Sequence, residues 1–284
     1  MIVMTIARFT IHEAISRRLV LAALILSAAF LGLYLLGYSL VLRQLIDASA
    51  GVGSRTVVAG GLVALTLLGL YAVSFLSSFL ALFLSVGAIS SDVESGTLYA
   101  ILARPIRRSS YLIGRWLGVS CIALVYSLIM ASGVLAIASI VGDYQAIDAP
   151  RAVALMLLNV LVLVTMGFFA STWLSTLAGG MVCFSVFGLA WIAGIIELVG
   201  GFIDNIAMIN LGIAVSLLFP SDALWRGASY YAQSTAAQLL QAGSRSVIPF
   251  AAGSPPVTIF VVWAIFEPIC LLVAAIYIMR RRDL

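Results

Sequence analysis

Six apolar runs, each long enough to cross a lipid bilayer, constrain this chain more than any other feature of its sequence. They cover residues 19–42, 57–89, 111–141, 152–174, 180–199 and 257–279. A membrane-spanning helix needs roughly 20 mostly apolar residues. Only 9% of the 284 residues are charged, whereas soluble domains carry about 25%. The sequence therefore predicts an all-α, polytopic membrane protein with six transmembrane helices, folded as a single domain over residues 1–284.

The second and third apolar runs are longer than a bilayer requires. A helix of 30 residues measures about 45 Å, against about 30 Å of hydrocarbon. Both helices should therefore tilt strongly or protrude from the membrane. The segment 90–110, which joins them, is expected to stand in water.

The arginines orient the predicted bundle. All 15 basic residues are arginines, and with six spans ten of them fall on the side that holds both termini and the segment 90–110. Because positive charge is enriched on the cytoplasmic side, we predict a multi-pass plasma-membrane protein with both termini in the cytoplasm. The segment 201–256 is then extracytoplasmic, and its apolar run 206–219 is short enough to be interfacial or re-entrant.

Residues 4–18 precede the first span and show a helical polar face. Thr5, Arg8, His12 and Ser16 recur at steps of three or four residues, with apolar positions beside them. This pattern predicts a basic amphipathic helix that lies in the membrane interface. A simple solvated leader is the alternative.

Several kinds of chemistry are excluded by what the sequence lacks. Without a lysine there is no P-loop and no Schiff-base chemistry, so this chain should not bind ATP itself. One histidine and three dispersed cysteines offer neither a metal site nor a disulfide framework. We therefore expect no enzyme activity, no cofactor in this chain and no nucleic-acid partner, and we consider an intramembrane enzyme the weakest alternative.

The segment 90–110 has the most distinctive composition in the chain. It combines two acids, a glycine break, a proline, an apolar side and several arginines; the residues that we single out are Asp92, Glu94, Gly96, Thr97, Leu98, Arg104, Pro105 and Arg107. A surface with both signs of charge and an apolar side suits the docking of another protein. The alternative is that the arginines only fix topology or contact phospholipid headgroups.

The pattern Glu94-x-Gly96-Thr97-Leu98, then Arg104-Pro105-x-Arg107, then Gly114-Arg115, resembles the cytoplasmic signature of type-2 ABC transporter permeases. Arg115 stands where that family usually has lysine, and the segment 219–226 also resembles a stretch before the last span of many members.

The resemblance implies a membrane subunit, usually of an exporter, that pairs with a second permease, identical or related. It also implies two ATPase subunits, which would bind ATP and Mg²⁺. Glu94, Gly96, Thr97 and Leu98 would contact the ATPase, with Asp92, Arg104, Pro105 and Arg107 beside them. The transported substrate is not identified by the sequence.

Polar residues inside the predicted spans are rare. Glu267 precedes Pro268 near the middle of the sixth span, where a charge is costly and should face the bundle interior. We consider two roles for it, a contact on a substrate path or a brace for the proline kink. Asn159 is a second candidate for the substrate path, although helix–helix hydrogen bonding would also explain it. Glu197 is expected near the outer interface. A secondary transporter that uses Glu267 as an ion or proton site remains the alternative function.

Overall fold

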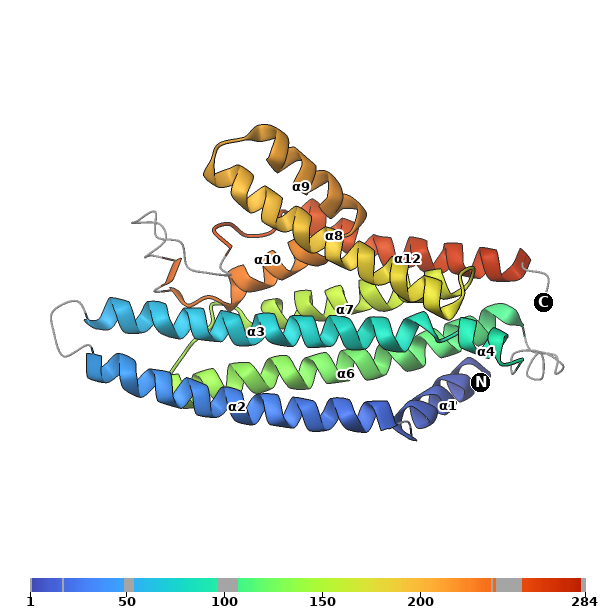
Figure 1. The fold of residues 1–284 in the computed structure, drawn as a ribbon, viewed down its shortest axis with the longest axis horizontal. Helices are drawn as coiled ribbons and strands as arrows, with labels where there is room; N and C mark the ends of the chain where they lie inside the picture. The colour runs from blue at the N-terminus through green and yellow to red at the C-terminus, as the bar shows by residue number, and fades with distance from the viewer. Residues whose placement is uncertain are drawn as a thin grey trace.

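The computed structural model describes residues 2–16, 18–48, 54–96, 107–235, 237–238 and 252–281. In these residues the protein is built from helices and turns, without strands (Figure 1). Six of the described helices are long and apolar enough to cross a membrane, which confirms the predicted fold class. They are α2 (Arg18–Ala48), α3 (Ser54–Val86), α6 (Arg108–Gly142), α7 (Ala149–Ser171), α8 (Thr176–Phe202) and α12 (Thr258–Arg281).

The second and third spans are as long as the sequence predicts. Helix α3 has 33 residues and α6 has 35, so each is about 50 Å long at 1.5 Å per residue. Both described chain ends lie at one end of the bundle, together with the short helix α4 (Ser90–Glu94) and the start of α6 (Figure 1). We call this end the terminal end.

The first helix, α1 (Ile2–Ser16), packs across α6 at the terminal end. Two glycines of α6 allow this approach, since a Cβ atom at Gly114 would stand 2.7 Å from Ile6 Cβ, and one at Gly118 the same distance from Thr10 Cβ. Thr10 is accordingly buried, whereas Phe9 is exposed. The sequence predicts a helix here, and the structure adds the helix that it packs against.

Two apolar clusters lie one after the other along the bundle. The cluster at the terminal end gathers Leu82, Leu112 and Phe168, and the other gathers Leu67, Met130 and Trp225. Helix α7 contributes to both clusters, because it runs between α3, α6, α10 and α12. This central helix holds the spans around it together by apolar burial and dispersion contacts.

The segment after α8 forms two further helices. Helix α9 (Ile206–Leu218) folds back along α8, and its first turn is capped by the Asn205 side chain, which accepts from the Ala207 and Met208 amides at 3.0 and 3.3 Å. Helix α10 (Ser221–Ala232) follows after a bend of 100°. The sequence predicts the short apolar segment, but it does not predict α10, which packs against α7.

Candidate functional site

Helix α4 and its neighbours contain the described part of the sequence-predicted docking segment. Gly96, which follows α4, has a positive φ of 75°, a conformation that glycine adopts without steric cost. Arg107 is exposed and extended, directly before α6 begins. The other predicted contact residues Thr97, Leu98, Arg104 and Pro105 lie outside the described residues.

Asp92 points into the protein and is bonded to α6. The residue is only 8% exposed, and its carboxylate accepts a hydrogen bond from the Tyr111 hydroxyl and forms an ion pair with Arg115. The Nε atom of Arg115 lies 3.1 Å from the same carboxylate oxygen. Because an unpaired buried carboxylate is costly, these contacts fix α4 against α6.

The same guanidinium reaches a second acid, on α1. Its Nη1 atom lies 2.6 Å from Glu13 Oε2. Arginine suits this position because its planar group presents donors in several directions, whereas a lysine would offer a single ammonium. Glu13 is not among the residues predicted from the sequence, although it is the only acid before Asp47 and shares a helical face with Thr10.

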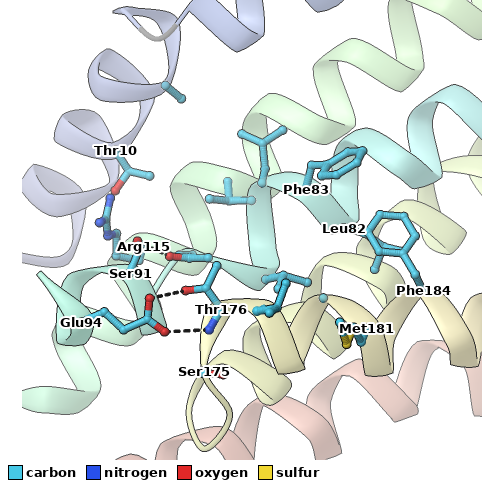
Figure 2. Close-up of a pocket in the computed structure, with 18 of the residues that line it drawn as sticks. Thr10, Leu82, Phe83, Ser91, Glu94, Arg115, Ser175, Thr176, Met181 and Phe184 are labelled. Atoms are coloured by element: carbon cyan, nitrogen blue, oxygen red, sulfur yellow. Dashed lines mark hydrogen bonds between the residues drawn. The ribbon is translucent and has the colours of Figure 1, made fainter.

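Glu94 points the other way and is bonded to α8. Its carboxylate accepts from the backbone amide of Thr176 at 2.8 Å and from the Thr176 hydroxyl at 3.1 Å (Figure 2). The Thr176 hydroxyl is also 2.8 Å from the Ser90 hydroxyl. A carboxylate at a helix N-terminus pairs with unsatisfied amides and with the positive end of the helix dipole. One short helix is thus joined to α6 and, through Arg115, to α1 on one side, and to α8 on the other.

A groove of about 840 Å³ opens beside α4, and residues of α1, α3, α4, α6 and α8 line it (Figure 2). Its walls are largely apolar and include Leu82, Phe83, Met181 and Phe184, while Glu13, Glu94 and Arg115 give it polar groups. An apolar cavity with a few polar groups is the usual form of a small-molecule site.

A second polar cluster joins α8 to α10. Arg226 donates to both carboxylate oxygens of Glu197, at 2.6 and 2.7 Å, and its Nε atom lies 3.0 Å from Asp222. Asp222 in turn packs directly against Gly194 of α8. Glu197 is expected from the sequence at the outer interface, but its arginine partner, 29 residues away, is not predicted.

The two intramembrane candidates lie outside the groove. Asn159 accepts from the Ser221 hydroxyl at 2.7 Å and donates to the Ser78 hydroxyl at 3.4 Å, so it forms the helix–helix hydrogen bonds considered above. Glu267 is buried on α12 beside Pro268, and its Oε2 atom has no hydrogen-bond partner in the described part of the chain. The structure therefore does not bring Glu267 and Asn159 together with the α4 contacts.

Among the described residues, no group of three or more His, Cys, Asp or Glu side chains could hold a metal ion. What the α4 region offers is a set of bonded helix ends beside a groove.

The chain matches a known protein family. A family model described as ABC-2 family transporter protein covers residues 4–283, almost the whole chain. No curated protein matches the chain significantly. Because the family match extends over all six spans, the chain belongs to the ABC-2 family of transporter proteins and is a membrane permease subunit of an ABC transporter.

Proposed function

We propose that this chain is the permease of an exporter, and that a separate ATPase drives it from the terminal end, through α4 and the segment that follows it. The observation that supports this role is the bonding of α4. Its Asp92 is tied to Arg115 of α6, and its Glu94 is tied to Thr176 of α8. A displacement of α4 would therefore move α1, α6 and α8 together.

The proposed ATPase must lie in the cytoplasm, and the charge distribution supports that orientation for the terminal end. Several arginines among the described residues lie at the terminal end, at positions 8, 107, 108, 115, 280 and 281. Arginine-rich ends of spans face the cytoplasm. In the proposed orientation both termini and the segment 90–110 are cytoplasmic, and the segment 201–256 is outside.

The proposed complex contains two copies of the ATPase and a second permease, identical to this one or related to it, in the plasma membrane. ATP and Mg²⁺ would bind in the ATPase, since this chain has no lysine for a P-loop. Membership in the ABC-2 family favours this arrangement over a secondary transporter that uses Glu267. Within it, Thr97, Leu98, Arg104, Pro105 and Arg107 remain proposed contacts.

Charge reversal at Glu94 tests the proposed coupling. The chain would be coexpressed with an ABC ATPase subunit that copurifies with it, and the complex reconstituted in proteoliposomes. We expect Glu94→Arg to insert and fold but to lose most of the permease-dependent, vanadate-sensitive ATP hydrolysis, because the α4–α8 bond at Thr176 is lost. The matched control is Asp47→Arg, since Asp47 is an exposed acid at the opposite end of the bundle.

Two results would contradict the proposal. One is a Glu94→Arg complex that hydrolyses ATP at the wild-type rate. The other is a failure of the chain to bind the ATPase in detergent or in lipid. A fall in ATP hydrolysis in both Glu94→Arg and Asp47→Arg would instead indicate a general effect of charge on insertion. The control variant is measured beside the test variant for this reason.

A further inference from the structure

The groove beside α4 has the size and lining of a ligand site. Its volume of about 840 Å³ lies inside the range of about 300–1,000 Å³ typical of sites for drug-sized molecules. Leu82, Phe83, Met181 and Phe184 form its apolar walls. A ligand that fits here needs an apolar body.

Among the described residues, the polar end of the groove has more acidic than basic side chains. Glu13 and Glu94 line it, together with the basic Arg115. That guanidinium is already bonded to Asp92 behind the wall and to Glu13. Glu94 accepts hydrogen bonds from Thr176, but it has no cationic partner in the described residues. A positive charge in the groove would supply that partner.

Aromatic rings continue from the groove along α3 and α8. Phe83 and Phe184, which line the groove, have ring centroids 5.1 Å apart, and Phe184 lies 5.5 Å from Phe79. The rings of α3 recur every four residues, and the series continues through Phe75 to Tyr71, whose centroid is 5.3 Å from that of Phe75. Aromatic faces attract cations through their quadrupole, most strongly where water is excluded.

We propose that the groove binds a lipophilic organic cation, a single positive charge carried on an apolar body. Glu94 supplies the counter-charge, and Phe83 and Phe184 supply the aromatic wall. The binding of this ligand in the groove is independent of the proposed function. Its role as the transported cargo rests on the proposed function. A cation on Glu94 would also contact α4 directly, so an occupied groove would be sensed where the ATPase is proposed to act.

The test is a binding measurement on the full chain in nanodiscs of zwitterionic lipid, without the ATPase. Tetraphenylphosphonium is the probe, and tetraphenylborate, an anion of nearly the same shape, is the control ligand. After subtraction of the uptake by protein-free nanodiscs, we expect saturable binding of the cation alone in equilibrium dialysis. Glu94→Gln should weaken it about five-fold, because the charge is lost while an oxygen remains to accept from the Thr176 amide. Asp47→Asn is the matched control and should bind like the wild type.

Equal binding of the two ions, each after subtraction of its uptake by protein-free nanodiscs, would overturn the proposal, since an apolar site without charge preference would explain it. Unchanged cation binding in Glu94→Gln, at an unchanged melting temperature, would overturn it as well. Phe83→Ala provides an independent variant on an exposed ring, and it too should weaken binding of the cation. If the cation binds as expected but no ATPase associates with the chain, the proposed function fails and the binding site stands.

Discussion

Replacing Arg115 by alanine should be among the most destabilising single changes at the terminal end. The substitution leaves Asp92 and Glu13 without their shared guanidinium. Removal of one partner from a buried ion pair costs about 3–5 kcal/mol of folding free energy. Glu13 is 27% exposed at its side chain, and Tyr111 still donates to Asp92, so both carboxylates keep some solvation. We therefore expect Arg115→Ala to lower the free energy of unfolding by about 3 kcal/mol, the lower limit of that range.

A lysine at position 115 tests the geometry separately from the charge. The guanidinium contacts Glu13 through Nη1 and Asp92 through Nε and Nη2. One ammonium cannot occupy both places, so Arg115→Lys should lose one of the two charged contacts. The expected cost is about 1.5 kcal/mol, the lower range for a hydrogen bond to a charged group.

The measurement is equilibrium unfolding of the purified chain in mixed micelles, with a double-mutant cycle. Arg115→Ala and Asp92→Asn should together cost less than the sum of their separate costs, since they remove one interaction, with a coupling of about 1–2 kcal/mol. The control is Arg151→Ala, an arginine 69% exposed at its side chain and paired with Asp148, which should cost under about 1 kcal/mol. A cost of Arg115→Ala no larger than that of this control, or an additive cycle, would contradict a stabilising role of the buried ion pair.

Three further substitutions test other parts of the fold. Gly118→Val should push α1 away, because Thr10 Cβ stands 2.7 Å from the position of the new Cβ, and faster proteolysis of the N-terminus would show it. Arg226→Ala should lower the free energy of unfolding by about 1–3 kcal/mol, since it leaves Glu197 unpaired between α8 and α10; an unchanged value would show that the pair is not stabilising. Gly96→Ala should cost about 1 kcal/mol at its positive φ, seen as faster hydrogen exchange in α4.

The spans could be predicted because the bilayer itself imposes their length and composition. The length and composition of membrane spans do not predict α10, because this helix is short and carries Asp222 and Arg226, as a polar loop would. Its charges are tolerated because they pair with each other and with Glu197 on α8. Such pairing depends on how the helices are placed in space, and local sequence patterns do not predict that placement. The second span differs slightly from the predicted run 57–89, because α3 ends at Val86 and a turn separates it from α4.

The docking segment could be located from the sequence, but the separate roles of its two acids could not. Asp92 and Glu94 are two residues apart and look equivalent. The structure buries the first because Arg115 lies opposite it, 23 residues along the chain. The second stays exposed and accepts hydrogen bonds from Thr176 at the start of α8, 82 residues along the chain. Only the packing of α4 distinguishes the buried acid, which binds α6, from the exposed acid, which binds α8.

The contact between α1 and α6 also sets an order for biogenesis. Helix α1 is made before the spans, whereas the glycine face on which it packs, and the arginine that binds Glu13, are made about a hundred residues later. During synthesis of the first two spans, α1 therefore lacks the surface of α6 on which it packs in the finished bundle. Its docking becomes possible only once the third span is in place, so the position of the first helix reports whether the early bundle has been inserted correctly.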